Sequence, residues 1–177
     1  LVIRYRAYFV RRLQEAAPAV HRDFSGGREA LSLTYQTVSS VSDPTAAPQQ
    51  ILEQLRDHQE RHRQAELDSR QCLSGPHKDD LLVELDGRSA KTYGSQGQTR
   101  TAALSLKLAQ RDIFFQETGE YPVLLLDDVL SELDARRQAF VLNHIQGGQI
   151  FITCCEEEKL EGLEGGAAFH IHGGALV

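Results

Sequence analysis

The segment from Tyr121 to Asp134 reads YPVLLLDDVLSELD and constrains the fold more than any other part of the chain. Four consecutive aliphatic residues, Val123–Leu126, are typical of a strand buried on both faces of a parallel sheet. The strand runs directly into two carboxylates, Asp127 and Asp128. In phosphate-handling α/β folds, ligands lie beyond the carboxyl ends of such strands, where an aspartate can hold Mg²⁺ directly or through water. A second acid can accept a proton from an attacking water.

A second interpretation of this segment is a core strand followed by a solvated acidic turn, in which Ser131 or Asp134 caps the next helix. The segment alone leaves both interpretations open. A helix predicted over 135–145, a break at Gly147-Gly148 and an apolar strand over 149–153 complete a strand–helix–strand unit.

A second motif, YGSQGQTRTAALSLKLA, begins at Tyr93 and leads into a helix predicted over 99–117. The free amides and the positive dipole end of that helix point at the preceding loop, which makes an anion site. The alternative is a glycine-rich connection with ordinary capping, and this motif alone does not decide between them. The loop offers glycines for close approach and polar side chains for contact: Gly94, Ser95, Gln96, Gly97 and Gln98.

The remaining patterns predict a mixed arrangement of helices and strands. Apolar spacing predicts a helix over 1–16 that ends near Pro18, and alternation predicts strands over 31–37 and 81–85. Asp86-Gly87 is a hairpin turn signal. Further expected elements are a loop over 39–50, a thinly apolar helix over 48–70 with Pro48 in its first turn, and an edge strand over 169–172.

The composition is that of a globular chain: 177 residues, 41% hydrophobic and 25% charged, enough for one domain or one domain with part of another. The longest apolar run is far shorter than a membrane span, and no signal peptide follows Leu1. Three cysteines, two of them adjacent, favour a reducing, cytoplasmic setting. The net charge of −6 leaves room only for a local basic patch.

Three motifs in order, SGPHKDDL, YGSQGQTRTAALSLKLA and PVLLLDDVLSELD, resemble the C-terminal half of bacterial RecF, a recombination mediator ATPase related to the ABC and SMC heads. The resemblance is dense over 72–154 and weaker over 1–71. It implies an α/β fold, the C-terminal half of an ABC/SMC-type P-loop ATPase head with part of an inserted α-helical and β arm domain. We therefore expect 1–71 to be the end of the arm, or lever, and 72–177 to be the half-head.

The resemblance also implies roles for individual residues. Asp127 matches the Walker B carboxylate that holds Mg²⁺, and Asp128 stands at the place of the catalytic Glu. Thr153 lies where ABC ATPases carry the switch His, so the switch function is in doubt here. The signature motif, which contacts the γ-phosphate bound on the opposite protomer, is matched by Gly94, Ser95, Gln96, Gly97 and Gln98. The D-loop at the dimer interface is matched by Ser131 and Asp134.

The sequence contains no G-x-x-x-x-G-K-[ST] loop, which RecF places in its N-terminal half. Without the amides and the Lys of that loop, this chain has no cradle for the β-phosphate. The chain also has no Met. We therefore expect a piece of a longer protein that begins inside the arm and does not hydrolyse ATP measurably alone, since ATP and Mg²⁺ both require the other half.

For the intact protein the resemblance implies an ATP-dependent homodimer on DNA, at gaps or at single-strand/double-strand junctions. Slow ATP hydrolysis would release the dimer, and RecO and RecR would be its partners in loading RecA during DNA replication, gap repair and the SOS response at the bacterial nucleoid. Two rival functions remain. One is the head of another SMC-like or Rad50-type ATPase, which would carry long heptad arms. The other is a non-catalytic interaction module that kept the fold without turnover.

Smaller features have two interpretations each. Arg4, Arg11 and Arg12 either contact the DNA backbone or form an ordinary charged helix surface. His58 and His62 are four residues apart on one helix face, which suits a metal pair, but no HExxH order and no third ligand accompany them. The loop 75–80 is interpreted as a shaped junction between domains, and Cys154-Cys155 as strand packing.

Overall fold

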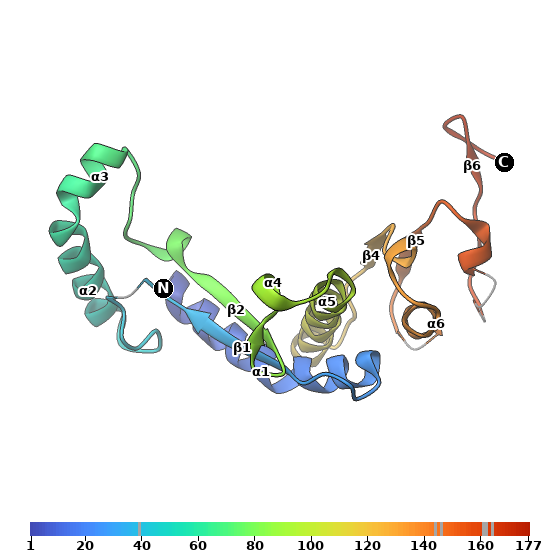
Figure 1. The fold of residues 1–177 in the computed structure, drawn as a ribbon, viewed down its shortest axis with the longest axis horizontal. Helices are drawn as coiled ribbons and strands as arrows, with labels where there is room; N and C mark the ends of the chain where they lie inside the picture. The colour runs from blue at the N-terminus through green and yellow to red at the C-terminus, as the bar shows by residue number, and fades with distance from the viewer. Residues whose placement is uncertain (39, 144, 146, 161–162, 164) are drawn as a thin grey trace. The chain divides into compact units, whose positions relative to one another are not determined.

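The computed structural model describes residues 1–38, 40–143, 145, 147–160, 163 and 165–177. Within these ranges the chain forms two compact units, Leu1–Ile113 and Phe114–Val177 (Figure 1). Ser39 of the predicted loop and His144 of the last predicted helix lie outside the described residues. In the described ranges, no helix is both long enough and apolar enough to cross a bilayer.

The first unit opens with the helix α1, Val2–Ser25, which is longer than predicted. The prediction that the helix ends near Pro18 is wrong, because Pro18 lies inside it. A proline removes a single backbone hydrogen bond from the ladder, whereas the turns that follow bury His21 and Phe24 completely or nearly so. Burial therefore outweighs the local penalty. The helix ends at Gly26, whose φ of 71° is the left-handed conformation that glycine adopts without strain.

The sheet of the first unit begins with β1, Leu31–Gln36, which pairs antiparallel with β2, Asp80–Leu85, along its whole length. Both predicted alternating strands are confirmed, and Leu31 and Leu33 of β1 point into the core. β1 precedes the predicted boundary at 71/72 and β2 follows it. The division into an arm over 1–71 and a half-head over 72–177 therefore stays a prediction about the parent protein, separate from the two compact units.

The predicted hairpin turn joins β2 to β3, Arg88–Ser89, which pair antiparallel. Asp86 has a φ of 51° and Gly87 a φ of 74°. Positive φ at both central residues is what a two-residue type I′ turn requires, and Asp-Gly is one of the pairs that adopt it. The carboxylate Oδ1 of Asp86 also accepts the backbone N–H of Ala30 over 2.9 Å, which ties the turn to the start of β1.

The single helix predicted over 48–70 is wrong in its continuity, because the structure divides it into α2, Pro48–Arg61, and α3, Arg63–Ser69. Pro48 occupies the first turn of α2, as predicted. At the break, both the backbone N–H and the side-chain Nδ1 of His62 lie within hydrogen-bond distance of the His58 carbonyl oxygen. The His62 ring therefore competes with the backbone for the His58 carbonyl oxygen, which in an uninterrupted helix accepts only a backbone N–H. None of the described residues of α3 is buried, so core packing does not hold the helix straight.

The first unit continues through a 3₁₀ turn at Pro76–Lys78 and a short helix, α4, at Ala90–Tyr93. The long helix α5, Gln96–Thr118, follows. Its apolar positions between Ala102 and Ile113 pack with those of α1, β1, β2 and α4 in one core, which anchors the middle of the helix. The buried core residues are Leu13, Ala17, Leu31, Leu33, Leu85, Ala90, Ala102, Ala109 and Ile113.

The second unit contains the predicted strand–helix–strand arrangement. β4, Leu124–Asp127, and β5, Ile150–Thr153, pair in parallel, which confirms the predicted parallel geometry. A 3₁₀ turn, Leu130–Glu132, leads to α6, Ala135–Asn143. The positive φ values of Gly147 and Gly148 fit the predicted break before β5.

The prediction that the strand at 123–126 is buried on both faces is wrong, because one face of the parallel pair carries large exposed apolar side chains. Leu125 is 71% exposed and Phe151 is 51% exposed, and the register places them opposite each other. Asp127 and Thr153 are two residues further along the same strands and are also register partners. Because side chains alternate between faces with a period of two, this apolar pair and the acid–threonine pair share one face.

The last strands form a separate hairpin. β6, Ile171–His172, pairs antiparallel with β7, Ala175–Leu176, through Gly173 and Gly174. The edge strand predicted over 169–172 thus exists in part, but its partner is β7. Glycine at positive φ in both turn positions explains why the chain reverses here.

Candidate functional site

The tandem acids lie at the carboxyl end of β4, beside Thr153 of β5. The Thr153 hydroxyl donates a hydrogen bond to Asp127 Oδ1 over 2.5 Å. The same hydroxyl oxygen accepts the backbone N–H of Asp128 over 3.0 Å. One hydroxyl group therefore holds both acids, and all three residues are exposed. The sequence placed Thr153 only at the switch position, and no local pattern could reveal this contact between residues 26 positions apart.

Asp128 has a φ of 48°, which is unusual for a residue other than glycine. Left-handed backbone at such a position costs on the order of 1–3 kcal/mol, and Asp and Asn tolerate it better than most residues. The Asp128 N–H also faces the Thr153 carbonyl oxygen at 3.2 Å. The neighbouring strand therefore maintains a strained backbone at the second acid, a feature that clusters at functional sites.

A divalent cation would find part of its coordination shell here. The hydrogen bond from Thr153 engages Asp127 Oδ1, and the second carboxylate oxygen can still act as a ligand. Protein-bound Mg²⁺ commonly takes one or two carboxylates and completes its shell with water and substrate phosphates. Among the described residues, no group of three His, Cys, Asp or Glu could hold a metal by itself. The residues present fit a Mg²⁺ that is shared with a nucleotide.

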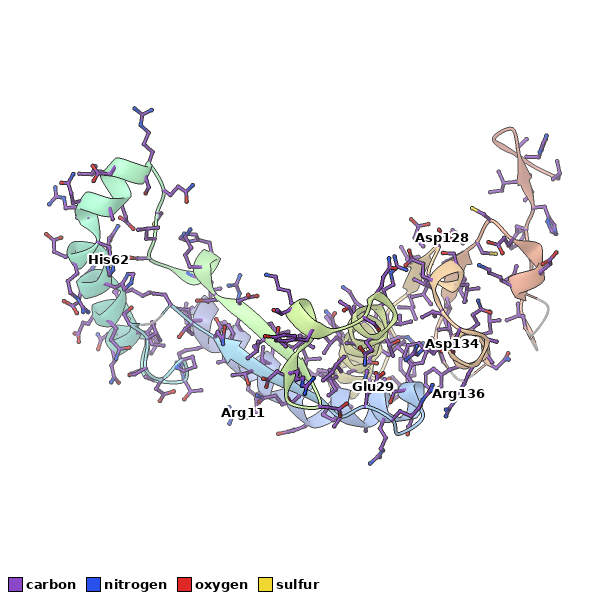
Figure 2. The ribbon with its side chains drawn as sticks, viewed as in Figure 1. Arg11, Glu29, His62, Asp128, Asp134 and Arg136 are labelled. Atoms are coloured by element: carbon purple, nitrogen blue, oxygen red, sulfur yellow. The ribbon has the colours of Figure 1, made fainter. Side chains whose placement is uncertain are left out.

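Ser131 and Asp134, the predicted D-loop residues, both make hydrogen bonds within the second unit. Ser131 Oγ donates to the Asp128 carbonyl oxygen over 2.9 Å. Asp134 caps α6, because its Oδ1 accepts the backbone N–H of Arg137 over 2.9 Å and its Oδ2 pairs with the Arg137 guanidinium at 3.2 Å. Asp134 thus acts as the N-cap that the second interpretation allowed, while Asp128 stays exposed at the strand end (Figure 2).

The signature segment forms the start of α5 in the first unit. The prediction that the helix begins at Thr99 is wrong by one turn, because α5 begins at Gln96. Ser95 and Gln98 explain the earlier start: the Gln98 N–H donates to Ser95 Oγ over 3.3 Å, and the Ser95 N–H donates to Gln98 Oε1 over 2.9 Å. This is a capping box, whose sequence pattern, Ser-x-x-Gln, is itself a signal for a helix that starts just after Ser95.

The capping box leaves the anion-binding capacity of this helix end in place. The first N–H groups of an α-helix lie outside its hydrogen-bond ladder. Ser95 satisfies the N–H of Gln98, so the amides of Gln96 and Gly97 remain at the exposed positive end of a 23-residue helix. The two interpretations of the segment are therefore compatible.

Gly94 has a steric reason to be glycine. A Cβ at this position would lie 2.5 Å from the Ala90 carbonyl oxygen and 3.0 Å from Thr99 Oγ1. Thr99 Oγ1 itself bonds to the carbonyl oxygens of Ala90 and Ser95, at 3.3 and 3.0 Å. Close approach at Gly94 thus brings the end of α4 against the first turn of α5.

The predicted DNA-contacting arginines lie on α1, on the side away from the core. Arg4 and Arg11 are exposed, whereas Arg12 is half-buried and has an interaction of its own. Two tyrosines, Tyr5 and Tyr8, are exposed on the same helix. The sequence predicted contacts for the arginines alone, although the spacing of the two tyrosines on a helix is a signal that they share a side with Arg4 and Arg11.

The loop 75–80 is organised around a buried carboxylate. The Asp79 side chain is only 1% exposed, and its Oδ2 accepts the Tyr35 hydroxyl over 2.5 Å and lies 3.4 Å from Arg6 Nη1. Arg6 also donates to the Pro76 carbonyl oxygen. Burial and the neighbouring carboxylate raise the pKa of the Tyr35 phenol. These bonds tie the loop to α1 and β1, which gives it a structural role.

The paired imidazoles stack on each other with ring centroids 4.0 Å apart. His58 Nδ1 lies 2.7 Å from Ser74 Oγ, and His62 Nδ1 lies 2.9 Å from the His58 carbonyl oxygen. One nitrogen of each ring is therefore engaged within the protein. Cys154 is half-buried, Cys155 is exposed, and both lie beyond the end of β5, so the interpretation as buried strand packing is wrong.

Comparisons with known proteins extend these observations. No protein-family model matches the chain. It is 44% identical over 179 residues to the DNA replication and repair protein RecF of Bacillus subtilis, covering 99% of this chain and 48% of the relative. It is 40% identical over 176 residues to RecF of Listeria monocytogenes, covering 97% of this chain and 46% of the relative. The chain thus spans about half the length of the curated relatives it matches.

Solved structures agree with the sequence matches. A structure described as the recombination mediator protein RecF-ATPrS in the RecFOR pathway superposes with a TM-score of 0.81 at 34% identity, over 99% of this chain and 46% of that one. The RecF-ATP structure gives a TM-score of 0.79 at 33% identity. The chain is therefore similar along nearly all of its length to the C-terminal part of RecF, with the mixed α/β fold of that part, as its three motifs predicted.

Proposed function

We propose that this chain carries the signature-motif and Walker B half of a RecF-like recombination mediator, an ATPase that dimerises on DNA when ATP is bound. The observation that best supports this proposal is the Thr153 hydroxyl that joins Asp127 and the Asp128 backbone at the carboxyl end of a parallel strand pair. A parallel strand end of this kind is where α/β folds bind nucleotides. The proposed setting is the bacterial cytoplasm, with DNA gaps or single-strand/double-strand junctions as targets and RecO, RecR and RecA as partners.

In this proposal the two acids have separate tasks. Asp127, oriented by Thr153, is the protein ligand of Mg²⁺, which neutralises phosphate charge when it is bound. Asp128 orients an attacking water and accepts its proton. Its carboxylate is exposed at a strained backbone position. The arrangement works by positioning and electrostatics, without a covalent intermediate.

The signature segment acts on the nucleotide of the opposite protomer. Ser95 and the amides of Gln96 and Gly97 would meet the γ-phosphate at the exposed N-terminus of α5. A nucleotide contacted by both protomers makes all of its contacts only in the dimer. ATP therefore binds the dimer more tightly and shifts the equilibrium from monomer to dimer by mass action. The symmetric dimer would contain two such shared sites.

The test compares Ser95→Asp with Ser95→Asn in the full-length parent protein. Both residues are good N-caps, so both variants keep the start of α5. Only the aspartate places a negative charge against the γ-phosphate. We expect Ser95→Asn to retain most ATP-dependent dimerisation in light scattering and Ser95→Asp to lose it, while each monomer still binds ATP. Ser95→Arg is expected to lose dimerisation as well, for steric reasons.

Equal dimerisation of Ser95→Asp and Ser95→Asn would contradict the contact across the interface. If the wild-type parent protein binds DNA with neither ATP-dependent dimerisation nor turnover, the non-catalytic interaction module becomes the better description. A DNA-stimulated ATPase assay on the same preparations separates these outcomes.

The outer side of α1 is the proposed DNA-contacting surface. Arg4 and Arg11 are exposed there, together with Tyr5 and Tyr8. Each phosphate contact adds about 0.9 to the slope of log affinity against log salt on duplex DNA. We expect Arg4→Ala with Arg11→Ala to lower that slope by up to about 2. Arg63→Ala, at a highly exposed site on α3, serves as the control and should leave the slope unchanged.

A further inference from the structure

A buried polar cluster joins α1 to α5 inside the first unit. His21 of α1 and Ser105 of α5 are both 0% exposed, and His21 Nδ1 lies 3.1 Å from Ser105 Oγ. On the other side of the ring, His21 Nε2 lies 3.3 Å from Oε2 of Glu29, whose side chain is 13% exposed. Three separate segments of the chain thus meet at one imidazole.

The positions of the hydrogen atoms in this cluster follow from the hydrogen-bond acceptors around it. The single hydroxyl hydrogen of Ser105 is donated to the Thr101 carbonyl oxygen over 2.7 Å. The Ser105 oxygen can then only accept from His21, so Nδ1 carries a hydrogen. His21 Nδ1 is therefore a hydrogen-bond donor to the Ser105 hydroxyl oxygen. The other edge of the ring, at Nε2, faces the Glu29 carboxylate.

The order Ser–His–Glu matches the partners of a nucleophilic triad, but burial excludes that function. Ser105 has no exposed surface, so no substrate can reach its oxygen. Its hydroxyl hydrogen is directed along α5 to Thr101. What remains is a directional contact between two helices.

A directional contact narrows the placement of two helices beyond what apolar packing does. The residues that α1 and α5 contribute to the shared core include the small side chains Ala17, Ala102 and Ala109, which interlock less than large ones. The His21–Ser105 bond exists only over a narrow range of relative placements. Any other placement leaves a buried donor or acceptor without a partner, which is strongly unfavourable.

The position of this bond on α5 matters for the signature segment. Ser105 lies about 15 Å along the helix from Ser95, at about 1.5 Å per residue. A tilt of roughly 5° about Ser105 would move Ser95 by about 1 Å over that length. Displacements of about 1 Å can lower the rate of a reaction by about a hundredfold. A small change in the His21–Ser105 contact would therefore displace Ser95 enough to weaken the proposed phosphate contact.

We infer that His21 is a positioning residue, which sets the placement of α5 and so presents the signature segment to the nucleotide of the opposite protomer. The inference rests on the proposed function, because it names what holds the trans-acting segment in place. It also links α1, which bears the proposed DNA-contacting surface, to that segment through a buried hydrogen bond.

The experiment uses the full-length parent protein and three variants. Ser105→Ala removes the acceptor and leaves the His21 N–H without a partner. His21→Asn keeps a side-chain N–H donor near the Nδ1 position and is the conservative rescue. Ile113→Val is the matched control, since it removes one buried methyl group from the same helix outside the cluster. Thermal unfolding, ATP binding to the monomer and ATP-dependent dimerisation are measured for each.

At a temperature where all variants are folded, we expect Ser105→Ala to weaken ATP-dependent dimerisation at least tenfold with ATP binding to the monomer unchanged. Ile113→Val should dimerise like the wild type despite its loss of stability, and His21→Asn should fall between wild type and Ser105→Ala. Should Ser105→Ala not fold, Ser105→Cys repeats the test with a poorer acceptor of similar size.

Two outcomes overturn different claims. Wild-type protein that fails to dimerise with ATP overturns the proposed function. If the wild-type protein dimerises and Ser105→Ala dimerises equally well, only the role of His21 is overturned. The same holds if dimerisation follows thermal stability across all variants. Ring ¹⁵N chemical shifts of His21 provide an independent check, because a donor to Ser105 requires a protonated Nδ1; an unprotonated Nδ1 would contradict the contact.

Discussion

Thr153 donates its hydroxyl hydrogen to Asp127 Oδ1 over 2.5 Å, although the two residues are 26 positions apart in the chain. The bond orients the first acid, and the same oxygen accepts the N–H of Asp128. The switch function of Thr153 stays a prediction. The contacts of its hydroxyl with the two acids instead give this residue a positioning role at the end of β4.

Two substitutions of Thr153 distinguish the contribution of its hydroxyl group from that of its methyl group. Thr153→Val keeps the shape but removes both hydrogen bonds, so we expect Asp127 to lose its orientation and ATP turnover in the full-length protein to fall about tenfold or more. Thr153→Ser keeps the hydroxyl and should retain most turnover. Steady-state ATPase assays at saturating Mg²⁺ provide the measurement. Equal rates for the valine and serine variants would show that the hydroxyl is dispensable.

Asp128 offers a test of charge against backbone conformation. Asn also tolerates the left-handed backbone found here, so Asp128→Asn removes the charge with little strain. We expect this variant to keep ATP-dependent dimers and to hydrolyse ATP more slowly. Asp128→Ala adds strain as well and should unfold at a lower temperature than Asp128→Asn. Unchanged hydrolysis in Asp128→Asn would remove Asp128 from the catalytic role.

The substitution Gly94→Ala tests whether packing requires a glycine at this position. A methyl group there would lie 2.5 Å from the Ala90 carbonyl oxygen, so α4 or α5 must shift. We expect Gly94→Ala to lower the free energy of unfolding by about 1–3 kcal/mol, the usual cost of overpacking. Gly165→Ala is the control, because a Cβ there meets nothing within 4 Å. Chemical denaturation of both variants gives the comparison, and equal midpoints would contradict the steric explanation.

The stacked histidines predict a dependence of stability on pH. Burial, followed by the charges of His62 and Arg61, lowers the pKa of His58 below its ordinary value. A depressed pKa in the folded state means that the unfolded chain binds the proton more readily, so stability is lost as pH falls through about 6.5. We expect the thermal midpoint to be lower at pH 5.5 than at pH 7.5, with a smaller difference in His58→Gln. An NMR titration in which His58 titrates at or above its ordinary value would contradict this.

Local sequence signals predicted much of the fold. The apolar run before Asp127, the Asp86-Gly87 turn and Pro48 at the start of α2 depend on neighbouring residues only, and each appears in the structure. The helix through Pro18 could not be predicted in this way, since burial of residues beyond it decides the outcome. The start of α5 could have been predicted, because Ser95 and Gln98 have the spacing of a capping box.

The site itself was only partly accessible from sequence. The tandem acids and the glycine-rich segment were identified by their types and spacing, and the structure puts them at a strand end and a helix start. The contacts of Thr153 with Asp127 and of His21 with Ser105 join residues that are distant in the chain. Such pairs have no local pattern, so only the folded arrangement reveals them.

Leu125 and Phe151, exposed side by side on the parallel strand pair, have a practical consequence for the isolated chain. An uncovered hydrocarbon surface of this kind attracts other such surfaces in water. Preparations of the 177 residues alone should bind hydrophobic dyes and self-associate as concentration rises. Polar substitutions at these two positions would then improve solubility without touching the acids at the strand ends.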